Sequence, residues 1–104
     1  MVKQTAGRDA LTGFADDFAR YNDDVLFGEV WNNPNISLHN RSMITISCLV
    51  GKGIVDDSLK YHITTAKKNG VTKEEMASML TQLGFYAGWP KAWAALKMAR
   101  EVYK

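Results

Sequence analysis

Apolar residues recur at helical spacing in nearly every segment of this chain, whereas the alternation typical of strands is weak throughout. The first predicted helix carries Leu11, Phe14, Ala15 and Phe18 at positions i, i+3, i+4 and i+7. The pattern predicts an all-α fold, a bundle of about six helices joined by short loops. Because 104 residues with 46% hydrophobic content suffice for one core, we expect a single domain over residues 1–104.

Capping and breaking residues predict the helix boundaries in the first half of the chain. Residues 22–24 offer cap side chains for a short helix over residues 25–31, and the proline within residues 32–35 breaks that helix. Ser37 can cap a third helix that runs to about Val50. We expect this helix to be central because its apolar side chains leave little polar surface. They are Met43, Ile44, Ile46, Leu49 and Val50.

The second half carries sharper signals. The two glycines in residues 51–53 end the third helix, and Asp56 or Asp57 begins the next one. That helix ends at Gly70, which can take the left-handed position after the last turn. The segment Thr72-Lys73-Glu74-Glu75 forms a capping box, which predicts a helix start. The turn at residues 88–90 then precedes a last helix, in whose first turn Pro90 is tolerated. Its larger apolar side chains share one side: Trp93, Leu96 and Tyr103.

His62 interrupts one of these apolar stripes. It falls among Leu59, Ile63 and Ala66, where the spacing leads one to expect another aliphatic side chain. Burial pushes an imidazole toward its neutral form unless a carboxylate or carbonyl holds one ring nitrogen, and such a group can exchange protons near neutral pH. Two interpretations stay open: a core histidine satisfied by a backbone carbonyl, and a residue that transfers protons.

Charge and composition exclude several kinds of partner. The net charge of +2 comes from 13 basic and 11 acidic residues without a run of five or six like charges, so we expect no nucleic-acid partner. Residues 1–9 lack the apolar core of a signal peptide, and no apolar run approaches the length of about 18 residues that a membrane span needs. We therefore expect a cytoplasmic protein without a membrane partner.

Cysteine and histidine usage limits the chemistry further. The single cysteine, Cys48, cannot form an intrachain disulfide, in agreement with a reducing compartment. The two histidines, His39 and His62, form no His-x-x-x-His pair and accompany no cysteine cluster, so we expect no metal site. Five methionines and three tryptophans in so short a chain indicate apolar surface that an oligomer would bury.

Several short strings stand in a distinctive order. They are Gly-Glu-Val-Trp at 28–31, Arg-Ser-Met-Ile-Thr-Ile at 41–46, His62 with Ala66, Asn-Gly-Val-Thr at 69–72 and Tyr-Ala-Gly-Trp-Pro at 86–90. In this order and spacing the chain resembles the carboxymuconolactone decarboxylase family, from about Gly7 to Tyr103. The resemblance implies an all-α fold similar to alkyl hydroperoxidase D, homo-oligomers that are commonly hexameric rings built as trimers of dimers, and a pocket near the helix of His62.

The family divides into two chemistries. The peroxide-reducing branch, similar to alkyl hydroperoxidase D, carries a Cys-x-x-Cys motif whose second cysteine precedes the family histidine by four residues. Val55 and Ser58 occupy those two positions here, so the two-cysteine cycle has no thiols to use. Cys48 lies on the apolar third helix, where we expect burial to raise its pKa and leave it in a structural role.

The decarboxylase branch carries Gly-Glu-[Ile/Val]-Trp, which residues 28–31 match, and His-x-Arg-x-Ala, which His62 and Ala66 match. The resemblance makes His62 the proton-transfer residue and Glu29 the carboxylate that orients it. Glu29 follows apolar residues at helical spacing, beside a face where an unpaired carboxylate would be costly. An ordinary ion pair is the alternative for Glu29.

Substrate binding is less well defined, because Thr64 stands where the decarboxylase branch usually has arginine. A substrate with several carboxylates favours a guanidinium, whereas threonine supplies only a neutral hydroxyl. Arg41 matches a family position and is the candidate carboxylate anchor, with a structural ion pair as the alternative. Tyr86 and Trp89 bracket a turn and are candidate substrate-binding residues, or else core or subunit contacts.

The resulting hypothesis is a carboxymuconolactone decarboxylase-like enzyme of aromatic catabolism, which decarboxylates a small lactone acid or performs a related proton transfer. A conjugated carbonyl of such a substrate can accept the electrons that decarboxylation leaves, so we expect no metal or organic cofactor. A thiol-dependent peroxide-reducing protein is one alternative. A non-catalytic oligomeric binding protein that keeps the fold is another.

Overall fold

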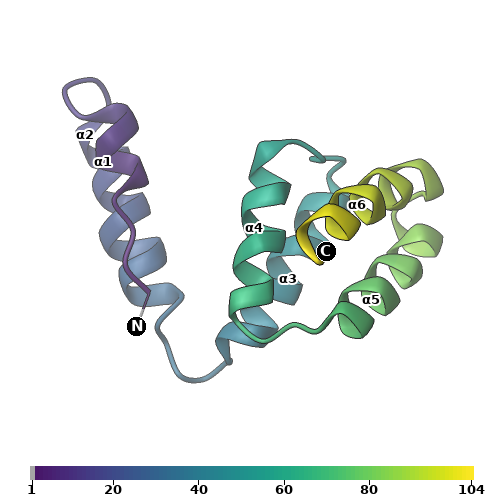
Figure 1. Ribbon diagram of the computed structural model, residues 1–104. Helices are drawn as coiled ribbons and strands as arrows, with labels where there is room; N and C mark the ends of the chain where they lie inside the picture. The colour runs from purple at the N-terminus through teal and green to yellow at the C-terminus, as the bar shows by residue number, and fades with distance from the viewer. Residues whose placement is uncertain (1) are drawn as a thin grey trace. The chain divides into compact units, whose positions relative to one another are not determined.

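The computed structural model describes residues 2–104, and all of their regular secondary structure is helical (Figure 1). The all-α prediction is therefore confirmed. The elements are α1 (Ala6–Leu11), α2 (Asp16–Arg20), the π-helix η1 (Tyr21–Val30), α3 (Leu38–Gly51), α4 (Asp57–Lys68), α5 (Lys73–Tyr86) and α6 (Trp89–Val102). They form two compact units, one ending at Ser37 and the other spanning Leu38–Lys104. No helix in the described part of the chain is both long and apolar enough to cross a membrane.

The N-terminal unit differs from the sequence prediction at its first helix. A turn after α1 separates it from α2, and Gly13 adopts a left-handed φ of 84° there. The apolar spacing from Leu11 to Phe18 does not mark one continuous helix, so that prediction is wrong. Phe14 is 90% exposed and Phe18 is 65% exposed, because the break points their rings away from the packed side of the unit.

Asp23 of η1 is hydrogen-bonded to the first turn of α1. Its buried carboxylate accepts the backbone N–H groups of Gly7, at 2.9 Å, and Arg8, at 3.0 Å. Burial alone would raise the pKa of Asp23, but the hydrogen bonds from Asn22 and from these two amides lower it. Asp23 thus caps α1 from a distance, whereas the sequence predicted a cap for the helix that follows it. That prediction is wrong, because α2 continues directly into η1.

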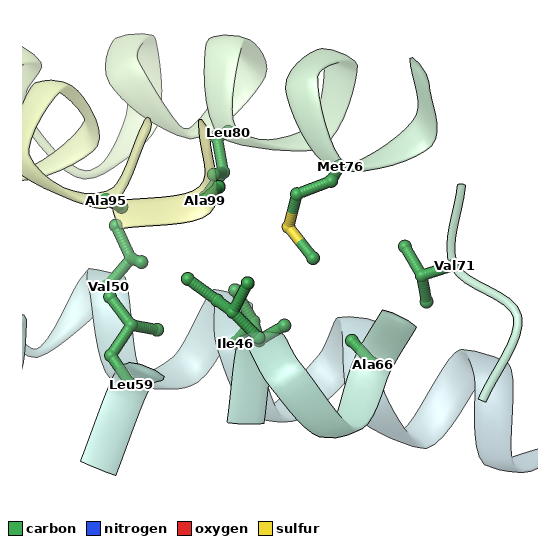
Figure 2. Packing of buried hydrophobic residues seen from close by; sticks show 10 residues of the cluster. Ile46, Val50, Leu59, Ala66, Val71, Met76, Leu80, Ala95 and Ala99 are labelled. Atoms are coloured by element: carbon green, nitrogen blue, oxygen red, sulfur yellow. The ribbon is translucent and has the colours of Figure 1, made fainter. Parts of the chain in front are cut away.

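In the unit Leu38–Lys104, α3 packs against α4, α5 and α6, which confirms its predicted central place. The core side chains come from all four helices and from the loop before α5, and in Figure 2 Met76 of α5 points toward the side chains of α3 and α4. They are Ile46, Val50, Leu59, Ile63, Ala66, Val71, Met76, Leu80, Ala95 and Ala99.

The helix ends in this unit follow the predicted local signals. Asp56 caps α4 by accepting the backbone N–H of Ser58 at 2.9 Å, and Gly70 adopts the left-handed φ of 91° after its last turn. The capping box of α5 is present, with Thr72 and Glu75 each accepting the other's backbone N–H. The contacts of Asp56 and the turn at Gly70 fix where α4 begins and ends, and the capping box fixes where α5 begins.

The last helix begins as predicted but packs differently. Pro90 lies in the first turn of α6. The side of α6 that is fully buried carries alanines at 92, 95 and 99, which allow the helix to approach its neighbours closely. Leu96 and Tyr103 pack against the core beside them, whereas Trp93 is 60% exposed. Only part of the predicted apolar side of α6 is therefore buried.

Candidate active site

His62 lies in the middle of α4, on the edge of the face that Leu59, Ile63 and Ala66 turn into the core. The imidazole is half-buried, and this burial lowers its pKa below the ordinary value of 6.5. The sequence predicted both the place in the stripe and the tendency toward the neutral form. At neutral pH the ring is mainly uncharged, and a nearby anion would be needed to favour its protonated form.

Tyr61 supports the imidazole, a contact that the sequence analysis missed. The two rings meet edge to face, with centroids 5.0 Å apart and planes at 85°. Tyr61 is itself 45% exposed, so the pair stands where α4 reaches the surface. The adjacency of two rings in the sequence was the available signal. The contact limits the orientations that the His62 ring can take.

Thr64 does not act as a substitute for the arginine that the decarboxylase branch carries at its position. Its hydroxyl donates a hydrogen bond of 2.8 Å to the backbone carbonyl of Lys60, one turn earlier in α4. The hydroxyl is thus held against its own helix. Any cation that binds a substrate carboxylate must come from another residue.

Arg41 lies in the first turns of α3, where the guanidinium is half-buried. The neighbouring Ser42 is buried, and its hydroxyl accepts a hydrogen bond of 3.0 Å from Asn69 at the end of α4. Arg41 is therefore placed near the C-terminal end of α4. The role of Arg41 as a carboxylate anchor stays a prediction.

Glu29 belongs to the other unit, where it is exposed near the end of η1. The sequence predicted an ordinary helix there, whereas the structure has π-helical hydrogen bonding, as in the 2.9 Å bond from the Trp31 amide to the Leu26 carbonyl. Such segments are rare and often occur at functional sites. The pairing of Glu29 with His62 stays a prediction.

Tyr86 and Trp89 flank the turn between α5 and α6. Tyr86 is 85% exposed, and Trp89 is 51% exposed with its ring edge against Phe85 at 5.6 Å between centroids. Figure 1 places this turn on the side of the unit away from α4. The structure therefore does not bring these two rings to His62 within one chain, and their role as substrate contacts stays a prediction.

Cys48 is exposed on α3, so the prediction that it is buried is wrong. It lies four residues after Ile44, which is 55% exposed, on a face of α3 that turns away from the core residues Ile46 and Val50. The helix is apolar on both faces, which made its outer face look buried in the sequence. The absence of the Cys-x-x-Cys pair is unaffected, because Val55 and Ser58 occupy those positions.

Comparison with known proteins agrees with the resemblance. The sequence model described as the carboxymuconolactone decarboxylase family matches residues 16–101. The chain is also 38% identical over 94 residues to a 4-carboxymuconolactone decarboxylase from Acinetobacter baylyi. That alignment covers 90% of this chain and 69% of the relative.

Proposed function

Because the chain belongs to the carboxymuconolactone decarboxylase family, we propose that it is a carboxy-lyase that removes CO2 from a small lactone acid. The observation that carries the proposal is the half-buried His62, whose pKa burial lowers, at the position of the family histidine. The similarity to a 4-carboxymuconolactone decarboxylase makes 4-carboxymuconolactone the first substrate to test. A compound of this kind needs one proton per turnover, which an imidazole can deliver.

Decarboxylation needs an acceptor for the electron pair of the bond that breaks. The bond between the carboxylate and the ring carbon breaks, CO2 leaves, and the electron pair moves into the conjugated lactone carbonyl to give an enolate. A ring carbon of that enolate then takes a proton, so a carboxylate and a proton become a C–H bond and CO2. Because the substrate holds the electron sink, the step requires only binding groups and a proton donor.

His62 is the proposed proton donor. Burial makes its protonated form a stronger acid than a free imidazolium, which favours transfer to carbon. The substrate carboxylate and Glu29 would supply the negative charge that lets the ring pick up its proton before the step. Arg41 is the proposed anchor for a second substrate carboxylate, since the Thr64 hydroxyl is bonded to its own helix.

We also propose that the protein acts as a homo-oligomer, a hexamer in the family's usual arrangement, in the cytoplasm. Several large apolar side chains of the unit Leu38–Lys104 are more than half exposed, more than an isolated surface normally carries. They are Ile44, Phe85, Tyr86, Trp89 and Trp93. Burial between subunits would also give Tyr86 and Trp89 the subunit-contact role that was their alternative.

A direct assay tests the proposed function against its alternatives. The purified protein is given 4-carboxymuconolactone while CO2 release is followed, and in parallel an organic hydroperoxide with a dithiol reductant. We expect lactone turnover without peroxide reduction. Peroxide reduction without lactone turnover would support the thiol-dependent alternative, for which the exposed Cys48 would be the first candidate. Failure of both reactions in a folded protein would favour a binding protein.

A further inference from the structure

A cavity of about 470 Å³ lies between the first turns of α5 and the last turns of α6. Its floor is formed by Ala77, Leu96 and Ala99, and the ring of Tyr103 closes one side. The Tyr103 hydroxyl donates a hydrogen bond of 2.6 Å to the Val71 carbonyl, and the Lys67 ammonium lies over the ring at 5.7 Å from its centroid, so the ring is held in place. Small-molecule sites typically have volumes of about 300–1,000 Å³ and mainly apolar walls. The cavity has the size and the lining of such a site.

The rim of this cavity is cationic. Lys73 contributes from α5, Arg100 from α6, and Lys104 from the segment after α6. Lys104 is held by Glu101 at 3.0 Å, which offsets its charge. Within residues 2–104, neither Lys73 nor Arg100 makes an ion pair, so two uncompensated positive charges on two helices border an apolar hollow.

The cavity is separate from the residues assigned to decarboxylation. Its lining comes from α5, α6 and the residues after α6, whereas His62 lies on α4 and Arg41 on α3. A ligand there would not need to contact the imidazole. Its chemistry follows from the lining: an apolar body for the floor and a single anionic group for the rim.

We propose that this cavity binds an amphipathic monocarboxylate, with its hydrocarbon part over Ala77, Leu96 and Ala99 and its carboxylate between Lys73 and Arg100. A carboxylate accepts hydrogen bonds from a guanidinium in a paired geometry, and a lysine ammonium adds a second charged donor. Burial of the hydrocarbon supplies the remaining affinity, because it removes apolar surface from water.

Octanoate is the probe for the wild-type protein, with titration followed by calorimetry. We expect saturable binding with a Kd of about 1 mM or lower. Two control ligands separate the two parts of the site: 1-octanol has the chain without the charge, and acetate has the charge without the chain. Each should bind at least about tenfold more weakly. Octanol binding as tight as octanoate, or no saturable octanoate binding, would overturn the proposal.

Variants locate the site. Arg100→Gln and Lys73→Gln should each weaken octanoate binding about tenfold, since each removes one charged donor. Lys52→Gln is the matched control, because Lys52 is an exposed cation outside the cavity lining, and it should bind octanoate as the wild type does. Lactone turnover should stay unchanged in all three.

Sedimentation distinguishes a ligand site from a subunit contact. The proposal predicts that the Arg100→Gln and Lys73→Gln proteins keep the wild-type oligomeric state. If these substitutions leave octanoate binding intact but dissociate the oligomer, the cavity is covered by a second copy of the chain and the proposal is wrong. Equal loss of octanoate binding in the Lys52→Gln control would also contradict it.

Discussion

The Nε2 atom of His39 lies 3.0 Å from the Oε1 atom of Glu75, and the same carboxylate oxygen accepts the backbone N–H of Thr72 at 2.9 Å. One side chain thus completes the capping box of α5 and joins α5 to the first turn of α3. The hydrogen bonds with Glu75 and with Asn40 raise the pKa of His39, and the bonds from Thr72 and His39 lower the pKa of Glu75.

This contact predicts a pH-dependent stability. Because the folded-state pKa of His39 lies above its ordinary value of 6.5, its contribution is complete below that pH and is lost as the pH rises through the raised pKa. His39→Gln should therefore lower the melting temperature more at about pH 6 than at about pH 9. His62→Asn is the control with the opposite pH dependence. Because burial lowers the pKa of His62, the buried imidazole destabilises the folded protein below pH 6.5. An equal loss at both pH values in His39→Gln would contradict the prediction.

A second prediction concerns Gly84, which lies inside α5 against the ring of Trp89. A Cβ atom at position 84 would stand 2.7 Å from the Trp89 Cε3 atom. Alanine gains about 1 kcal/mol of helix propensity, but overpacking typically costs about 1–3 kcal/mol. Gly84→Ala should therefore lower the free energy of unfolding and shift the tryptophan fluorescence. Gly51→Ala is the control, since a Cβ there meets nothing, and it should not destabilise. Equal stability of the two variants would count against the packing described here.

The third prediction tests Asp23 as the cap of α1. Asp23→Ala leaves the amides of Gly7 and Arg8 without their acceptor, and such a loss costs about 1–3 kcal/mol. Asp24→Ala is the matched control, because Asp24 is exposed and pairs only with the Arg8 side chain, an interaction typically worth less than about 1 kcal/mol. Urea denaturation compares the two. A lower stability of the Asp24→Ala protein than of the Asp23→Ala protein would contradict this capping role.

A fourth prediction follows from the position of Cys48. Although the thiol is exposed, the chain lacks the partner cysteine that a peroxide-reducing cycle needs. Cys48→Ser should therefore leave lactone turnover nearly unchanged. Measured peroxide reduction that disappears in the folded Cys48→Ser protein would instead favour the thiol-dependent alternative.

Local signals made much of the unit Leu38–Lys104 predictable. The cap at Asp56, the left-handed Gly70 and the Thr72–Glu75 box each involve partners within a few residues, so the sequence contains the whole interaction. The N-terminal unit was less predictable for the opposite reason. Asp23 caps an amide sixteen residues earlier, and nothing in the local pattern around it indicates that partner.

In the candidate site, too, the placement of some residues was predictable from the sequence and that of others was not. The half-buried state of His62 follows from its spacing relative to Leu59 and Ile63 along one helix. The exposure of Cys48 does not follow from local spacing. Both faces of α3 carry apolar side chains, so the packing of the neighbouring helices determines which face is buried. The place of Tyr86 and Trp89 likewise depends on how α5 and α6 pack, which no short spacing specifies.

The orientation of His62 gives a graded prediction. In the proposed pairing with Glu29, Glu29→Gln keeps an acceptor for the imidazole but removes the charge that would stabilise its protonated form. We expect a partial loss of lactone turnover and a shift of the active pH range to lower values, because the pKa of His62 would fall further. An unchanged pH profile in the folded variant would mean that Glu29 does not act on His62.

The most direct test of the account is the kcat for 4-carboxymuconolactone in His62→Asn, measured beside the wild type on protein whose folding and assembly have been checked. Asparagine can keep a hydrogen bond but cannot carry a proton at neutral pH. A general acid contributes about 10²- to 10⁴-fold, so we expect kcat to fall within that range while the oligomer persists. Unchanged turnover of 4-carboxymuconolactone by the folded His62→Asn protein would contradict the proposed mechanism and identify His62 as a core histidine.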